Sequence, residues 1–139
     1  MTKFAKGLYK IKNKEKYIGT HTPVFRSSWE CNFMIFLDNH TSIINWGSEC
    51  VRIPYKDPIT GKTKNYIPDF FIVYIDVNGK KCAEIVEIKP MNQSKMGKSA
   101  KNNALALRNH HKWSAALAYA SRNGCSFRLI TENQLFGNK

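Results

Sequence analysis

The sequence contains no apolar run that approaches the ~20 residues of a membrane-spanning helix, and no N-terminal signal pattern. Its four cysteines include no C-x-x-C pair, so a zinc knuckle is not indicated and reduced, mostly buried thiols are expected. A phosphate-binding glycine loop and a serine-triad signature are also missing. These absences predict a soluble protein of a reducing, intracellular compartment, with no membrane as partner.

Acidic residues are scarce, with 10 Asp and Glu against 22 Lys and Arg, and the net charge is +12 over 139 residues. Such an excess predicts a polyanionic partner, and nucleic acid is preferred over the second candidate, an anionic membrane surface. The length and the 42% hydrophobic content predict one domain with one core. We expect residues 1–20 to form a basic arm that lies along phosphates, or alternatively a solubilising tail, and residues 21–139 to form the domain.

Hydrophobic periodicity predicts the order helix, three strands, helix, strand. The first helix begins with a capping box, Ser27 followed by Glu30, and runs to about Asn39. Its expected core-facing stripe is Trp29, Phe33, Phe36 and Leu37. A long helix, from about residue 100 or 104 to 122, is expected to end at Asn123-Gly124. Its expected packed face is Leu105, Asn109, Trp113, Ala116, Leu117 and Ala120.

Strands are expected at residues 49–55, in both halves of the stretch 66–90 around the turn at Asn78-Gly79, and at residues 126–131. Glu49 is interpreted as the solvated end of the first strand. The adjacent histidines at 110 and 111 point about 100° apart on a helix, which argues against a shared zinc ion.

The stretch 66–90 holds acids inside its two apolar strands. Asp69 follows Pro68 in the first strand, and Glu87 and Lys89 share one face of the second. Charges on an apolar face are costly unless they are compensated, and two carboxylates converging across a hairpin are a natural site for a divalent cation. A lysine beside such a cation can orient or deprotonate water, so the pattern indicates a metal-dependent phosphodiesterase site. The alternatives are a buried Asp69–Lys89 salt bridge and an ordinary solvated strand end at Glu87 to Lys89.

The ordered set of motifs resembles the PD-(D/E)xK nuclease superfamily. More narrowly, it is similar to the head-completion nucleases of large tailed bacteriophages, which are related to the TnsA-type transposon endonucleases. The resemblance is carried by residues 26–30 (RSSWE), 46–49 (WGSE), 53–55 (IPY), 66–70 (YIPDF), 87–90 (EIKP), 112–113 (KW) and 127–132 (FRLITE). It implies a mixed α/β (α+β) fold with a restriction-endonuclease-like αβββαβ core, in which helices flank a central mixed sheet.

The resemblance also implies roles for five residues. Asp69 and Glu87 would bind Mg²⁺, with Mn²⁺ able to substitute, and Lys89 would position the attacking water. Glu30 would complete the acidic cluster from the first helix, and Lys112 would be an auxiliary basic residue.

Further basic residues are candidates for contacts with DNA; for Arg26 among them, and for Lys112, the alternative is a plain solvated cation. They are Arg26 before the first helix, Lys95, Lys98 and Lys101 in a basic loop after Pro90, and Arg108 on the long helix.

These features predict a Mg²⁺-dependent DNA endonuclease with little sequence specificity. The resemblance implies a role in phage head completion, with head and portal proteins as partners and the host cytoplasm or the virion as location. Two alternatives stay open: a virion structural protein with a vestigial nuclease site, and a junction-resolving or transposon-end nuclease.

Overall fold

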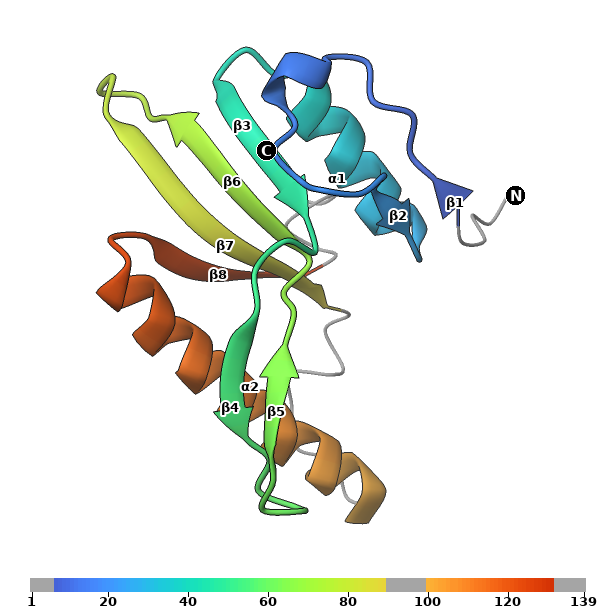
Figure 1. The fold of residues 1–139 in the computed structure, drawn as a ribbon, viewed down its shortest axis with the longest axis vertical. Coiled ribbons are helices and arrows are strands. Elements are labelled where there is room, and N and C mark those ends of the chain that lie inside the picture. Colours follow the sequence, from blue (N-terminus) through green and yellow to red (C-terminus); the bar gives the residue numbers. More distant parts are fainter. Residues whose placement is uncertain (1–6, 90–99, 132–139) are drawn as a thin grey trace.

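A four-stranded sheet in the order β3-β6-β7-β8 organises the computed structural model, which describes residues 7–89 and 100–131 (Figure 1). The strands are β3 (Ile43–Ser48), β6 (Phe70–Ile75), β7 (Lys81–Lys89) and β8 (Ser126–Thr131). β3, β6 and β7 are antiparallel neighbours, whereas β8 is parallel to β7. The parallel pairing follows from the connection between them, because the chain returns through helix α2 (Ala100–Arg122).

Helix α1 (Ser28–Asn39) covers one face of this sheet and begins as predicted: the Ser27 hydroxyl oxygen accepts a hydrogen bond of 3.1 Å from the Glu30 N–H. The predicted core-facing stripe is wrong in one part, because Phe36 is 46% exposed. The buried side chains of the helix are Cys31, Phe33, Met34, Leu37 and Asp38. The i, i+3, i+4 row through Met34 faces the sheet, and Phe36 therefore lies at the rim beside Phe33.

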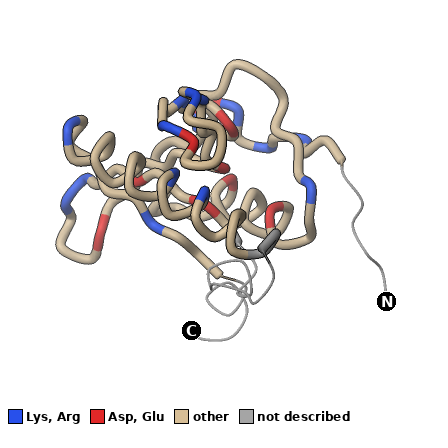
Figure 2. Tube along the Cα trace, turned by 90° about the horizontal axis from the view of Figure 1, so that it is seen from below, with Lys and Arg blue, Asp and Glu red and all other residues tan. Residues whose placement is uncertain are grey.

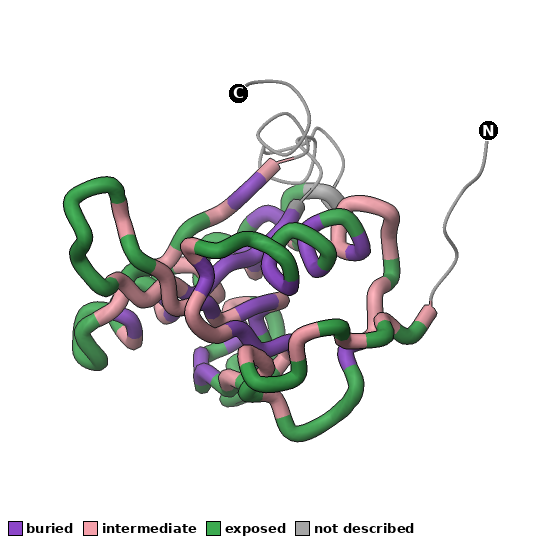
Figure 3. Tube along the Cα trace, turned by 90° about the horizontal axis from the view of Figure 1, so that it is seen from above, coloured by how far each residue is buried: buried purple, intermediate pink, exposed green. Residues whose placement is uncertain are grey.

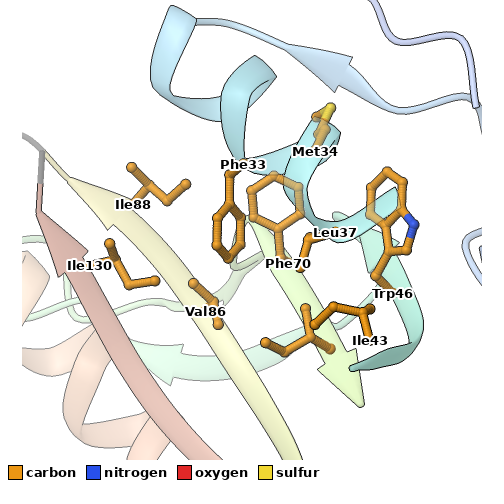
Figure 4. Packing of buried hydrophobic residues seen from close by; sticks show 10 residues of the cluster. Phe33, Met34, Leu37, Ile43, Trp46, Phe70, Val86, Ile88 and Ile130 are labelled. Carbon is orange, nitrogen blue, oxygen red and sulfur yellow. The ribbon is translucent and has the colours of Figure 1, made fainter. Parts of the chain in front are cut away.

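The larger hydrophobic core lies between α1 and the sheet (Figure 4). Trp46 of β3 and Phe70 of β6 are almost fully buried there, and Val86 and Ile88 of β7 point to the same side. Figure 3 shows the buried positions gathered in the interior and the exposed ones along the connecting loops. Since alternate residues of a strand face opposite sides, Ile85 and Glu87 belong to the other face of β7.

That other face is covered by α2 together with a hairpin of β4 (Ile53–Lys56) and β5 (Thr63–Tyr66). A second core of Ile53, Tyr55, Tyr66, Ile85, Ala116 and Ala120 fills this layer. In α2 the predicted packing of Leu105 and Leu117 is wrong, because these side chains are 42% and 57% exposed. The helix packs instead through small residues such as Ala106, and it ends as predicted at Gly124, whose φ is 72°.

The predicted strand at 49–55 is corrected by the structure. The edge strand of the main sheet is β3, which ends at Ser48, and β4 starts only at Ile53 and pairs with β5 in a separate two-stranded sheet. Trp46 decides this difference, because it is fully buried opposite Ile72 of β6. The predicted mixed sheet flanked by helices and the αβββαβ order are nevertheless confirmed, with β4–β5 as an insertion between β3 and β6.

The N-terminal part holds β1 (Gly7–Leu8), a 3-10 turn η1 (Lys14–Lys16) and β2 (Val24–Phe25). The fully buried Asp38 accepts hydrogen bonds from the Tyr9 hydroxyl at 2.6 Å and from the N–H groups of Lys12 at 2.7 Å and Asn13 at 2.9 Å. Residues 9–13 of the predicted basic arm are thus docked on α1, and the Ile18 N–H donates a hydrogen bond of 2.9 Å to the Trp46 carbonyl oxygen of β3. In the portion of the chain that the structure describes, neither helix combines the length and the apolar character needed to cross a membrane.

Candidate active site

The start of β6 and the end of β7 bring Asp69 and Glu87 together. Phe70 pairs with Val86, so the next position of the antiparallel register sets Asp69 opposite Glu87. Glu87 Oε1 accepts a hydrogen bond of 3.3 Å from the Asp69 N–H, and Asp69 Oδ2 accepts one of 2.8 Å from the Ile88 N–H. Glu87 is 6% exposed and Asp69 is half-buried. These bonds hold two carboxylates side by side at the edge of the second core.

Asp69 lies in a bend that precedes β6, whereas the sequence predicted it inside a strand that begins at Tyr66. The physical reason is Pro68, which has no N–H to donate to a strand ladder. The chain therefore leaves β5 at Tyr66, passes through residues 67–69 and enters the main sheet at Phe70. Asp69 stands where the chain changes from one sheet to the other.

Glu30 adds a third carboxylate from the first turn of α1. Its Oε1 accepts a hydrogen bond of 2.8 Å from the Arg26 N–H. Burial raises the pKa of Glu30, and the charges of Glu49 and Glu87 raise it further, against the opposing effect of Arg26. The carboxylate of Glu30 is thus close enough to Glu87 for the two charges to interact.

Glu49 belongs to the same neighbourhood, which the sequence analysis missed. Its N–H donates a hydrogen bond of 3.0 Å to the Asp69 carbonyl oxygen, and its carboxylate pairs with the Arg26 guanidinium. The backbone φ of Glu49 is 50°, which lies in the left-handed region that residues other than glycine rarely adopt. Nothing in the local sequence indicates this conformation, and the predicted solvated strand end is wrong because the side chain is only 26% exposed.

Tyr66 and Lys112 complete the surroundings of Glu87 from β5 and α2. The Lys112 Nζ lies 5.7 Å from the centre of the Tyr66 ring. Burial raises the pKa of Tyr66 far above its ordinary value, and the carboxylates of Glu87 and Asp69 add to the shift. Within residues 7–89 and 100–131 the buried Tyr66 hydroxyl has no hydrogen-bond partner of ordinary geometry, although Glu87 and Trp113 lie near enough to act on its pKa. In the sequence, Tyr66 is marked only by its place two positions before Pro68. Its position beside the two acids was not predicted.

Of the remaining predicted residues, some have described side chains and others do not. Lys89 closes β7 opposite Thr131 of β8, and its side chain is outside the described part of the structure. Lys95 and Lys98 lie outside the described residues, and Lys101 lies in α2 with its side chain likewise undescribed. Arg108 of α2 donates from Nε to Asp57 at 3.1 Å, and Arg26 is half exposed beside Glu49.

The carboxylate pair fits a magnesium ion by its chemistry. Within residues 7–89 and 100–131, no group of three or more His, Cys, Asp or Glu side chains is assembled that could hold a metal. Mg²⁺ in phosphoryl-transfer sites is usually held by only one or two carboxylates, together with waters and substrate phosphates. Asp69 and Glu87 supply the two carboxylates that this arrangement needs.

Comparison with known proteins connects this geometry to a family. Residues 40–132 match the model of the TnsA-like endonuclease N-terminal domain, which is about two thirds of the chain. The chain belongs to the TnsA-like endonuclease family. It is also 32% identical, over 139 aligned positions, to the head completion nuclease of Enterobacteria phage T4, and the match covers 93% of this chain and 92% of the relative. The predicted relationship to the head-completion nucleases is therefore confirmed.

The TnsA-like region contains Asp69, Glu87, Lys89 and Lys112, whereas Glu30 precedes its first matched residue. The match to the phage nuclease spans nearly the whole length of both chains. This relationship supports a nuclease role for the chain.

Proposed function

We propose that this protein is a Mg²⁺-dependent DNA endonuclease that acts in phage head completion, on packaged DNA ends and with little sequence specificity. The observation that carries the proposal is the pair of Asp69 and Glu87, hydrogen-bonded at the edge of the sheet in a chain of the TnsA-like endonuclease family. Phosphodiester hydrolysis builds negative charge on the phosphoryl oxygens, and two carboxylates fixed in advance would hold the divalent cation that stabilises this charge.

Each acidic side chain has a distinct task in this proposal. The Ile88 N–H orients Asp69, and the Asp69 N–H orients Glu87, so both carboxylates are aimed before a ligand binds. Mg²⁺ bound between them would supply a Lewis acid and an acidified water molecule. Glu30 extends the acidic cluster and, with its raised pKa, retains a proton more readily than an ordinary carboxyl group.

The basic residues act on the water and the phosphate. Lys89, two residues after Glu87, positions the attacking water or stabilises the negative charge that develops on the phosphoryl oxygens. Lys112, held over the Tyr66 ring, is the auxiliary cation on the α2 side. The net charge of +12 favours a polyanionic substrate such as DNA over a small phosphodiester, because each neutralised phosphate of a polymer releases counterions. Figure 2 shows basic positions outnumbering acidic ones along the chain.

The biological setting is proposed from the head completion nuclease of the T4 phage. DNA ends in a packaged head would be the substrate, head or portal proteins the partners, and the host cytoplasm or the virion the location. Little sequence specificity is proposed because no sequence pattern in the chain resembles a helix that reads the major groove.

The test is cleavage of plasmid, linear, single-stranded and branched DNA with Mg²⁺, Mn²⁺ or EDTA. We expect cleavage with either metal and none with EDTA. Asp69→Asn and Glu87→Gln should each lower the rate by about 100-fold or more, the order of loss when a group that stabilises the reacting centre is removed. Glu84→Gln is the matched control, because Glu84 lies on the same strand but on the opposite face, where it pairs with Arg128 at 2.9 Å.

Different results would redirect the proposal. DNA binding without cleavage of any substrate would favour a structural head-completion protein whose nuclease site is vestigial. Cleavage restricted to four-way junctions would favour a resolving nuclease. Equal loss of activity in Glu84→Gln and Asp69→Asn would contradict the assignment of Asp69 and Glu87 as the active site.

A further inference from the structure

We infer that the outer face of the β4–β5 hairpin, with the groove between β4 and α2, is a second contact surface for duplex DNA, separate from the acidic site. The inference rests on the proposed function for the identity of the polyanion. It concerns the outward-facing residues between positions 52 and 67 and the exposed side of α2, and it does not include Tyr66 and Lys112, which belong to the surroundings of Glu87.

The hairpin has two unlike faces. Ile53 and Tyr55 on β4 and Tyr66 on β5 are buried against α2. The residues of the other face are exposed: Pro54 and Lys56 on β4 and their cross-strand partners Asn65 and Thr63 on β5, with Arg52 and Ile67 next to the two strands. Buried and exposed residues alternate along β4, whereas on β5 only Tyr66 is buried, so the ribbon packs through one face. The other face is available to a partner, and a ribbon of this kind can enter or follow the major groove.

The surface of the hairpin is positively charged. Residues 52–66 contain four cations, Arg52, Lys56, Lys62 and Lys64, against a single acid, Asp57. Asp57 is fully buried, where Lys64 Nζ and Arg108 Nε both approach it at 3.1 Å. The negative charge is therefore neutralised inside. Among the described residues, Arg52 and Lys56 form no ion pair, so both remain available for phosphates.

A groove of about 530 Å³ runs between β4 and α2. Lys56, His110, His111 and Ser114 supply hydrogen-bonding groups along it, and Tyr55 contributes apolar surface. Cationic and neutral donors along an open groove suit a sugar–phosphate chain, which offers an oxygen acceptor at each nucleotide. The two exposed histidines, which are unsuited to a shared zinc ion, acquire a role here.

The position of the hairpin favours a long ligand. Its strand β5 leads through Ile67 and Pro68 directly to Asp69, and the hairpin extends away from the main sheet alongside α2 (Figure 1). The six residue steps from Thr63, at the start of β5, to Asp69 span at most roughly 20 Å. A ligand that reaches both the acidic pair and the far end of the hairpin therefore spans up to about 6 base pairs of duplex. A nucleotide or short oligomer cannot do so.

The test compares the full-length protein with Arg52→Gln/Lys56→Gln and with a control of equal charge, Lys80→Gln/Lys81→Gln. The control lysines are exposed at the turn between β6 and β7, at the end of β7 distant from Glu87. Affinity for a labelled duplex of 30 base pairs is measured by fluorescence anisotropy in EDTA at several salt concentrations. A duplex of 6 base pairs is measured in parallel, as is Mg²⁺-dependent cleavage of the long duplex.

We expect Arg52→Gln/Lys56→Gln to bind the long duplex about 10-fold more weakly, with a salt dependence reduced by about two phosphate contacts. The short duplex should be affected less, and the control should behave like the wild type. As a second variant, Asn65→Glu places a negative charge on the same face and should also weaken binding to the long duplex.

Wild-type affinity for the long duplex in both hairpin variants overturns the inference, as does an equal loss in the control. If the wild type then cleaves DNA and Asp69→Asn does not, the proposed function stands without the inference. Weakened binding by the hairpin variants of a protein that cleaves no DNA supports the contact surface and contradicts the nuclease. Absence of DNA binding by the wild type overturns both.

Discussion

Lys112 of α2 places its Nζ 5.7 Å from the centre of the Tyr66 ring on β5. The same tyrosine carries its hydroxyl into the field of Glu87 and Asp69, which raise its pKa together with burial. One aromatic side chain thus lies between the cation of the long helix and the acids of the sheet. It links the hairpin, α2 and the site in a way that separate motifs do not reveal.

Tyr66→Phe tests the state of that hydroxyl. A buried hydroxyl without a well-formed hydrogen bond costs about 1–3 kcal/mol, so its removal should raise the free energy of unfolding by about 1 kcal/mol. Urea unfolding monitored by circular dichroism gives the value, with Tyr55→Phe in the same core as the control. A loss of stability in Tyr66→Phe would show that the hydroxyl makes a strong hydrogen bond with Glu87.

Glu30→Gln should make stability less dependent on pH. The raised pKa means that the folded protein holds the Glu30 proton more tightly than the unfolded chain does. As the pH rises from the ordinary carboxyl range through the raised pKa, ionisation therefore opposes folding. The variant should melt at a higher Tm than the wild type at pH 7, and the two should converge at pH 4 and below.

Thermal melts across that pH range measure the effect, with the exposed Glu15→Gln as control. A Tm difference that stays constant from pH 4 to pH 7 would contradict the assignment of the shift to Glu30.

Asp57→Asn should loosen the hairpin. Burial opposes ionisation of Asp57, but hydrogen bonds from the Ile59 N–H and from Lys64, Arg108 and Thr60 outweigh it and hold the pKa well below its ordinary value. The carboxylate therefore stabilises the fold above pH ~4, and this contribution disappears as the pH falls further.

The Asp57→Asn variant should have a lower Tm at pH 7 and be cut faster within residues 57–62 by a protease. Its Tm deficit should shrink in acid. Lys62→Gln, in the same turn, is the control and should show neither effect, and a proteolysis rate equal to that of the wild type would argue against the Asp57 anchor.

Glu49→Gly and Glu49→Ala separate strain from charge. Both lose the pair with Arg26, but only glycine adopts a φ of 50° without the steric cost of a side chain. The free energy of unfolding should be about 1 kcal/mol higher for Glu49→Gly than for Glu49→Ala. Chemical denaturation of the two variants measures it. Equal stability would mean that position 49 relaxes out of the left-handed region when the side chain is shortened.

Local signals in the sequence were sufficient for much of the fold. The Ser27 cap, the Asn78-Gly79 turn and the Asn123-Gly124 end are short-range features, and the elements they bound appear where predicted. The hairpin of β6 and β7 also allowed Asp69 and Glu87 to be placed opposite each other. The faces of α1 and α2 were less predictable, since Phe36 and Leu117 are as apolar as their buried neighbours and only the position of the sheet decides which side is covered.

The sequence by itself determined which positions are acidic, where the positive charge lies along the chain, and the order of helices and strands. These properties depend on the residues themselves and on their neighbours along the chain. Tertiary structure alone decided that β3 takes the sheet edge, that β4 and β5 leave the sheet, and that Glu49 and Tyr66 lie beside Asp69 and Glu87. These arrangements depend on pairing and packing between residues distant in the chain, and such contacts leave no periodic trace in either partner.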